Sequence, residues 1–197
     1  MDKNKIEINL SELISIMLQY YSFIDEYGKK IKEEKIENKI FIKEENEKFT
    51  EFDYLCQTLL VNIIKKFYPY KNITIIGEES LNEENDKKII DLNNKDKSLL
   101  LSSKDKINLN GDFKIPRDFN KSIDITNSEI SIFVDPIDGT KSLIKKNYAP
   151  VTCLFGLCIK INHILVLFIL FLIKIIKHIS IFLLMGFLNS HHWSINL

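Results

Sequence analysis

The sequence predicts an α+β fold, and three observations lead to this prediction. Residues 10–31 and 50–67 carry apolar side chains at the near-helical spacing of two amphipathic helices. Three shorter stretches, 73–76, 130–134 and 151–159, are rich in β-branched and apolar residues, which favour strands. No internal repeat is visible, and the mixture of the two kinds of segment predicts an α+β domain.

The first predicted helix, residues 10–31, keeps its apolar side chains on one face. Ser11 is the expected N-cap, because its hydroxyl can accept a bond from a free backbone N–H of the first turn. Gly28 lies near the expected C-terminal end. The charged residues 32–48 that follow are expected to form the solvated end of the helix and a loop.

The second predicted helix begins at Thr50, which can cap it, and ends before Pro69, which lacks a backbone N–H. The short run 73–76 then predicts a buried strand. Residues 81–129 are polar and poor in aromatic side chains. We expect them to form a long surface insertion that is partly disordered.

Composition excludes some classes of function. Lysine plus arginine and aspartate plus glutamate number 27 each, so no net charge attracts nucleic acid or an anionic membrane. The three cysteines, Cys56, Cys153 and Cys158, fit no zinc or redox spacing. The first residues lack the apolar run of a signal peptide, and we therefore expect a cytoplasmic protein.

Two acidic clusters follow predicted strands, at positions where a rigid strand can hold reactive groups beside an open loop. The first cluster is residues 77–80 and the second is residues 135–140. In the second, Asp135 and Asp138 bring two carboxylates into one turn, and the Ile137 carbonyl can add a neutral oxygen. Mg²⁺ prefers such oxygen ligands and completes its octahedron with water and substrate phosphate.

The end of the second cluster is suited to an anion. Gly139 leaves room for a phosphate beside the backbone. Thr140 can cap a following helix, whose free N–H groups favour negative charge. A glutamate of the first cluster would share the metal. The alternative interpretation is a plain Asp-Pro, Asp-Gly turn between strands.

Residues 76–79 together with residues 134–140 resemble the paired signature of the inositol monophosphatase superfamily, the Li⁺-sensitive, Mg²⁺-dependent phosphatases. Within that superfamily, residues 74–81 and 138–141 look most like the 3′(2′),5′-bisphosphate nucleotidase branch. Residues 50–53 are similar to the family's Thr-x-x-Asp motif at the start of the second helix. The resemblance implies the N-terminal half of a layered αβαβα sandwich, within a domain of residues 1–162.

The resemblance also implies roles for individual residues. The implied Mg²⁺ ligands are Glu78, Asp135, Asp138 and the carbonyl of Ile137, with Glu79 as a less favoured glutamate. The residues implied in catalysis by water activation are Asp53, Thr140 and Glu78. The residues implied in substrate binding are Gly139, Thr140 and Lys141. The implied reaction is hydrolysis of the 3′-phosphate of adenosine 3′,5′-bisphosphate, with an inositol phosphate as the alternative substrate.

Residues 163–197 do not resemble the rest of such an enzyme. The resemblance implies a C-terminal half with a Trp-Asp metal ligand, but the single tryptophan, Trp193, precedes Ser194. The apolar stretch 164–188 has three interpretations. The first is a membrane span, although each central lysine would cost about 2.5–3.5 kcal/mol on insertion. The second is a strand over 164–172 followed by a helix. The third, which we prefer, is a sequence not selected to fold here, such as a retained intron. A truncated, catalytically incomplete fragment is therefore the second functional hypothesis.

Overall fold

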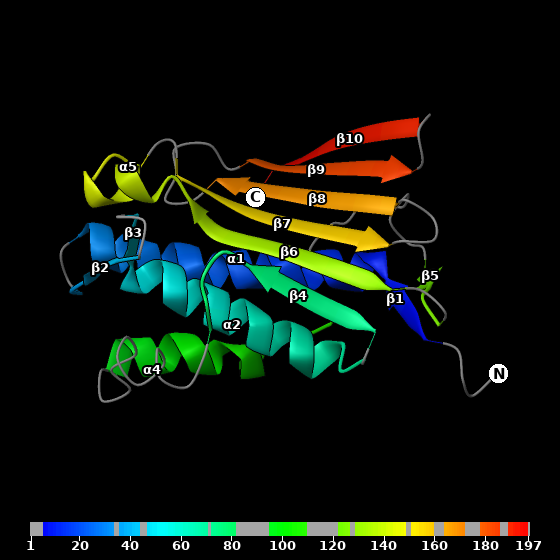
Figure 1. Cartoon of the computed structure of the whole chain (residues 1–197), viewed down its shortest axis with the longest axis horizontal. Coiled ribbons are helices and arrows are strands. Elements are labelled where there is room, and N and C mark those ends of the chain that lie inside the picture. Colours follow the sequence, from blue (N-terminus) through cyan, green and yellow to red (C-terminus); the bar gives the residue numbers. More distant parts are fainter. Residues whose placement is uncertain are drawn as a thin grey trace.

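The computed structural model describes residues 6–33, 36–43, 47–70, 72–81, 95–109, 122–126, 129–148, 151–159, 164–171, 178–185 and 189–196. Its mixture of helices and strands confirms the predicted α+β class (Figure 1). The helical elements are α1 (Leu10–Lys32), α2 (Glu51–Phe67), α4 (Lys95–Ser102), the 3₁₀ helix η1 (Ser103–Lys106) and α5 (Thr140–Ile144).

The main sheet has six strands in the order β10-β9-β8-β7-β6-β4. Its strands are β4 (Ile73–Gly77), β6 (Ile130–Asp138), β7 (Thr152–Ile159), β8 (Ile164–Phe171), β9 (His178–Met185) and β10 (Asn189–Asn196). β4 runs parallel to β6, and all other neighbours are antiparallel. Two small ribbons pair β1 (Glu7–Asn9) with β5 (Ser122–Asp124) and β2 (Ile40–Ile42) with β3 (Lys48–Thr50). Figure 1 shows α1 and α2 on one face of the main sheet.

Helix α1 agrees closely with the predicted range, but its cap differs. The N-cap is Asn9, whose Oδ1 accepts bonds from the backbone N–H groups of Ser11 at 2.9 Å and Glu12 at 3.2 Å. The prediction of Ser11 was wrong by two residues, because both residue types can cap and Asn9 stands first. The apolar face of α1 is buried and forms a large part of the core.

Helix α2 begins as predicted, with Thr50 as its N-cap, and ends before Pro69. A capping box forms: Asp53 N–H donates to the Thr50 hydroxyl, and the Asp53 carboxylate accepts from the Thr50 backbone N–H at 2.9 Å. The box has a consequence for function, because it fixes the direction of the Asp53 side chain.

The predicted strands are present, with two corrections. β4 is half-buried rather than buried, since it has a strand neighbour on one side only in the described sheet and Ile76 is 45% exposed. β6 does not stop at residue 134: it continues to Asp138, with an irregular register against β7 between Asp135 and Asp138. The second acidic cluster therefore belongs to the distorted end of a strand.

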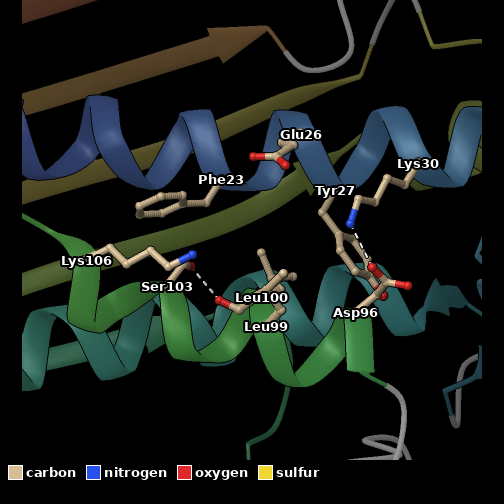
Figure 2. Close-up of a pocket in the computed structure, with 9 residues that line it drawn as sticks. All are labelled: Phe23, Glu26, Tyr27, Lys30, Asp96, Leu99, Leu100, Ser103 and Lys106. Carbon is tan, nitrogen blue, oxygen red and sulfur yellow. Dashed lines mark hydrogen bonds and ion pairs between the residues drawn. The ribbon is translucent and has the colours of Figure 1, made fainter.

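Part of the polar stretch 81–129 is folded onto the core, which the sequence analysis did not predict. Helix α4 packs against both α1 and α2, and its Leu100 is buried. A small cavity of about 60 Å³ remains between α1 and α4, where Lys30 forms an ion pair with Asp96 at 2.7 Å (Figure 2). The predicted disorder over 82–94 and 110–121 lies outside the described residues.

The apolar tail contributes three antiparallel strands to the main sheet. β8 agrees with the strand that one interpretation placed over 164–172, whereas β9 is a strand where that interpretation expected a helix. β10 lies beyond the stretch 164–188 that this interpretation covered. Within the described ranges, no helix has the length and apolar character needed to cross a membrane. The β-branched residues Ile179 and Ile181 favour a strand over a helix, which is consistent with this difference.

Candidate active site

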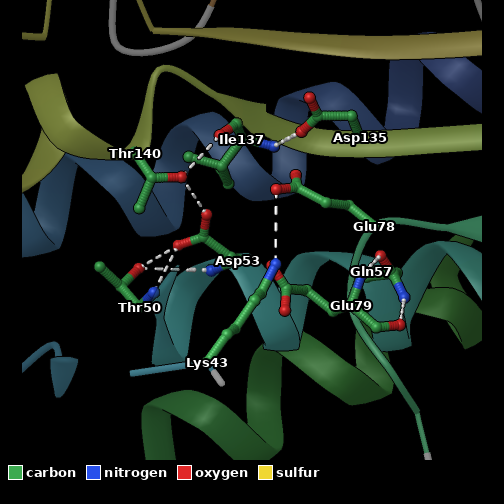
Figure 3. A network of polar contacts seen from close by, with 9 residues as sticks. All are labelled: Lys43, Thr50, Asp53, Gln57, Glu78, Glu79, Asp135, Ile137 and Thr140. Carbon is green, nitrogen blue, oxygen red and sulfur yellow. Dashed lines mark hydrogen bonds and ion pairs between the residues drawn. The ribbon is translucent and has the colours of Figure 1, made fainter. Parts of the chain in front are cut away.

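The N-terminus of α2 and the turn after β6 meet at a hydrogen bond between Thr140 and Asp53. Thr140 Oγ1 donates to Asp53 Oδ1 at 2.6 Å, and it also lies 3.0 Å from the carbonyl oxygen of Ile137 (Figure 3). The other oxygen of Asp53 accepts from the backbone N–H and the hydroxyl of Thr50. Burial raises the pKa of Asp53, while the hydrogen bonds from Thr140 and Thr50 act against that shift.

The turn itself differs from the predicted cap. Gly139, not Thr140, is the N-cap of α5, and it makes no side-chain cap bond. Its φ of 95° lies in the left-handed region, which glycine adopts without steric cost. Thr140 is the first residue of a helix of only five residues. Its hydroxyl is therefore free of capping and is used to bind Asp53 instead.

Glu78 and Asp135 are brought together by the parallel pairing of β4 with β6. The register sets Gly77 opposite Val134, and Glu78 N–H donates to the Val134 carbonyl at 3.1 Å. Glu78 and Asp135 are therefore the next residues along two neighbouring chains, and their carboxylates face each other (Figure 3). Burial, then the neighbouring charge of Glu78, then that of Asp138 raise the pKa of Asp135 to about 7. The shift reflects burial first and crowded negative charge second.

The remaining predicted residues surround the same pair. Asp135 Oδ1 accepts from the Ile137 N–H at 3.2 Å, which holds the two residues in a tight local turn. Asp138 Oδ2 accepts from the Thr152 hydroxyl at 3.2 Å, and Thr152 is its neighbour on β7. Lys141 is exposed at the start of α5.

A cavity of about 240 Å³ connects these groups. Its lining residues are Glu47, Lys48, Glu78, Asp135, Ile137, Asp138, Gly139, Thr140 and Lys141. The residues that the sequence analysis assigned to the site line this cavity, except Asp53 and the less favoured Glu79. Asp53 is buried and reaches the cavity only through its hydrogen bond to Thr140.

Three residues that matter here were not predicted. Lys43 places its ammonium 2.9 Å from Glu79 Oε1 and 3.4 Å from Glu78 Oε1. Lys48 lines the cavity, and Gln57 bonds to the backbone of Glu79. The abundance of lysine in the chain hides the first two, and a glutamine inside a helix gives no sequence signal at all.

The donor types fit a hard divalent cation. Carboxylate and carbonyl oxygens are the ligands that Mg²⁺ prefers, and Glu78 and Asp135 already face each other across the cavity. The ammonium of Lys43 lies 3.4 Å from Glu78 Oε1 and would compete with such a cation. In the part of the chain that the structure describes, no three His, Cys, Asp or Glu side chains are arranged to hold a metal ion. The fit therefore concerns a pair of carboxylates with Asp138 nearby.

Comparison with protein families places the chain. The model of the inositol monophosphatase family matches residues 7–166, which is most of the sequence. The chain therefore belongs to the inositol monophosphatase family, as the sequence resemblance predicted. The family is generally Mg²⁺-dependent, and membership supports a phosphatase, which is a hydrolase. No curated protein matches the chain.

Proposed function

We propose that this chain is a Mg²⁺-dependent phosphomonoesterase that removes the 3′-phosphate of adenosine 3′,5′-bisphosphate. The observation that carries the proposal is the 2.6 Å hydrogen bond from Thr140 to Asp53, made beside the facing carboxylates of Glu78 and Asp135. A hydroxyl bound to a buried carboxylate and a pair of acidic oxygen ligands, around one cavity, are what phosphate-ester hydrolysis requires.

The metal would be held first by the facing carboxylates of Glu78 and Asp135. The family resemblance adds the carboxylate of Asp138, which lies nearby, and the carbonyl of Ile137. When bound, Mg²⁺ would offset phosphate charge and lower the pKa of an attacking water. The crowded charge that raises the pKa of Asp135 supports cation binding, because a cation relieves that repulsion.

Asp53 and Thr140 would orient the attacking water. Thr140 has a single hydroxyl proton, and donating it to Asp53 leaves the oxygen lone pairs free to accept from a water in the cavity. Asp53 in turn is held by Thr50 through the capping box, so the Thr140 hydroxyl cannot rotate freely. This arrangement fixes the direction of one water proton before the substrate binds.

The proposed substrate carries more than one phosphate. Two exposed lysines from different elements, Lys48 of β3 and Lys141 of α5, line the cavity. A second phosphate on the substrate gives both ammonium groups a partner, whereas an inositol monophosphate has only the phosphate that reacts. The nucleotidase-like residues 74–81 and 138–141 support the same substrate.

Phosphate release tests the proposal. The chain is incubated with Mg²⁺ and either adenosine 3′,5′-bisphosphate or inositol 1-phosphate, with Asp135→Asn as the matched control. We expect Li⁺-inhibited release that is faster from the bisphosphate and absent in the control. Faster release from inositol 1-phosphate would overturn the substrate assignment.

The second candidate is a fragment that binds Mg²⁺ but lacks turnover. The observation that favours it is that only a pair of carboxylates faces each other in the described part of the site. Mg²⁺ binding in calorimetry without phosphate release from either substrate would support this candidate over the enzyme.

A further inference from the structure

Gln57 holds the backbone of the Gly-Glu-Glu segment through two hydrogen bonds from one side-chain amide. Gln57 Nε2 donates to the Glu79 carbonyl at 2.5 Å, and the Glu79 N–H donates to Gln57 Oε1 at 2.9 Å (Figure 3). The amide of Gln57 thus replaces a neighbouring strand at this point. Gln57 is buried, as is Glu79, so both backbone groups depend on this side chain for their partners.

Gly77 makes this contact sterically feasible. A Cβ atom at position 77 would collide with the side-chain amide of Gln57. Since the φ of Gly77 is not in the left-handed region, the glycine is explained here by space and not by backbone conformation. Gly77 and Gln57 therefore pack directly against each other, next to the backbone of Glu78.

The two hydrogen bonds between Gln57 and the Glu79 backbone, called the clamp from here on, connect the two halves of the proposed site. Gln57 stands one helical turn after Asp53 on α2, so the helix that carries Asp53 also holds the backbone that carries Glu78. Without the clamp, the Glu78–Glu79 segment would retain the Glu78 N–H bond to Val134 and the ion pairs of Lys43. The latter involve a long, flexible side chain and define a direction less strictly than two bonds from a buried amide.

We propose that Gln57 is a positioning residue that sets the Glu78 carboxylate against Asp135, so that the two can bind one divalent cation together. The inference rests on the proposed function, since it assigns Gln57 a task in metal binding. Partners that orient metal ligands without touching the metal commonly change metal affinity 10–100-fold when they are removed.

The chain contains its own matched control. Gln19 on α1 makes the same pair of bonds with Asn108: its Nε2 donates to the Asn108 carbonyl at 2.7 Å, and the Asn108 N–H donates to its Oε1 at 2.9 Å. Asn108 lies beyond η1 and does not line the acidic cavity. Gln57→Met and Gln19→Met each delete such a pair of bonds, but the pair of Gln57 is buried beside Glu78, whereas the pair of Gln19 is exposed and distant from the cavity.

The first experiment measures Mg²⁺ binding by calorimetry for the unmodified chain and both variants. We expect Gln57→Met to weaken Mg²⁺ binding at least about tenfold, and Gln19→Met to leave it within about twofold. Amide hydrogen exchange of Glu79, measured without metal, should become faster in Gln57→Met only. A Gln57→Met chain with unchanged exchange would show that the clamp does not form.

The outcomes separate the two proposals. An unmodified chain that binds no Mg²⁺ contradicts the proposed function. If Gln57→Met shows faster exchange of the Glu79 amide but binds Mg²⁺ as tightly as the unmodified chain, only the positioning role is contradicted. If Gln57→Met fails to fold, Gly77→Ala provides a second test, because its added methyl displaces the same amide.

A double-mutant cycle with Gly77→Ala and Gln57→Ala completes the test. We expect Gly77→Ala to weaken Mg²⁺ binding about tenfold in the unmodified background and less than about twofold when Gln57 is already alanine. Equal losses in both backgrounds would mean that Gly77 does not act through Gln57, and the inference would be overturned.

Discussion

Thr140 and Asp53 are separated by 87 residues in the sequence, yet their side chains are joined by a hydrogen bond of 2.6 Å. The bond links the turn after β6 to the first turn of α2. Asp53 also accepts from Thr50, so one buried carboxylate has donors from two segments. Burial alone would favour the protonated acid, and these donors are what support the ionised form.

Replacing Thr140 with valine should remove this link while keeping the shape of the side chain. A hydrogen bond to a charged group contributes about 1.5–3 kcal/mol, so we expect the free energy of unfolding to fall by that amount. The pKa of Asp53 should rise further, because one of the donors that lower it is gone. Denaturant titration measures the free energy of unfolding, and carbon-detected NMR measures the pKa of Asp53. Thr140→Ser keeps the hydroxyl and should behave like the unmodified chain; equal behaviour of serine and valine would contradict the link.

The stability of the chain should depend on pH through Asp135 when no divalent cation is present. Its pKa is raised in the folded chain, from 3.8 to about 7, so the folded state binds more protons than the unfolded state between these values. Stability from this group is complete below pH 4 and is lost as pH rises toward 7. Because Asp135 is only partly buried, solvent screening limits the loss to a few kcal/mol at most.

Two controls isolate that effect. Asp135→Asn cannot titrate, so its unfolding free energy should vary less between pH 4 and pH 7. Mg²⁺ should also reduce the loss in the unmodified chain, because a bound cation favours the ionised carboxylate. Chemical denaturation at a series of pH values gives both comparisons. A free energy of unfolding that changes by the same amount from pH 4 to pH 7 in both chains would contradict the prediction.

Lys43 should compete with a divalent cation. Its ammonium compensates the carboxylate of Glu79, which is only 3% exposed. Lys43→Met leaves that charge buried without its ion pair, and we expect a loss of about 1–3 kcal/mol in the metal-free chain. Mg²⁺ should then stabilise the variant more than the unmodified chain.

A surface lysine provides the control for Lys43. Lys29 pairs with Asp25 at 2.5 Å, but its side chain is 59% exposed. Lys29→Met should therefore change stability by less than about 1 kcal/mol and leave the effect of Mg²⁺ unaltered. Thermal unfolding with and without Mg²⁺ measures all three chains. A Lys43→Met chain that gains no more from Mg²⁺ than Lys29→Met would refute the competition.

Local rules predicted the helices α1 and α2 and the strands β4, β6 and β7, but not α4 or the strands of the two small ribbons. The range of α2 follows from its apolar spacing, from the cap at Thr50 and from Pro69, all of which act within a few residues. The strand run at 130–134 was recognised for the same reason, but its continuation to Asp138 was not. That continuation depends on pairing with β7, a partner that the local sequence does not specify.

The candidate site needed more than local rules. The proximity of Asp53 to Thr140 was implied by a family resemblance and by no spacing in the sequence, since sequence separation does not determine distance in space. The approach of Glu78 to Asp135 depends on the register between β4 and β6. Gln57 was missed because its importance lies in a contact with a backbone, and a backbone partner leaves no pattern of residue types.

Lys97 was overlooked because a lysine in a polar stretch is normally a surface residue. In the structure it forms an ion pair with Glu51 at 2.5 Å, and both side chains are at least 97% buried. The pair ties α4 to the first residue of α2, two positions before Asp53. This contact makes α4 part of the folded core and not a surface insertion.

Lys97→Met should therefore be among the most damaging single substitutions in the described part of the chain. Removing one partner of a buried ion pair costs about 3–5 kcal/mol, because the remaining charge is buried with neither water nor an opposite charge to stabilise it. Adding Glu51→Met should recover most of that loss, since two apolar side chains of similar volume can replace such a pair.

Lys66 is the control: it also joins α2 to the segment after α4, through Asp105 at 3.0 Å, but both side chains are exposed. Lys66→Met should cost less than about 1 kcal/mol. Equal unfolding free energies for Lys97→Met and Lys66→Met, in denaturant titrations at the same pH, would mean that α4 does not pack on α2 in solution.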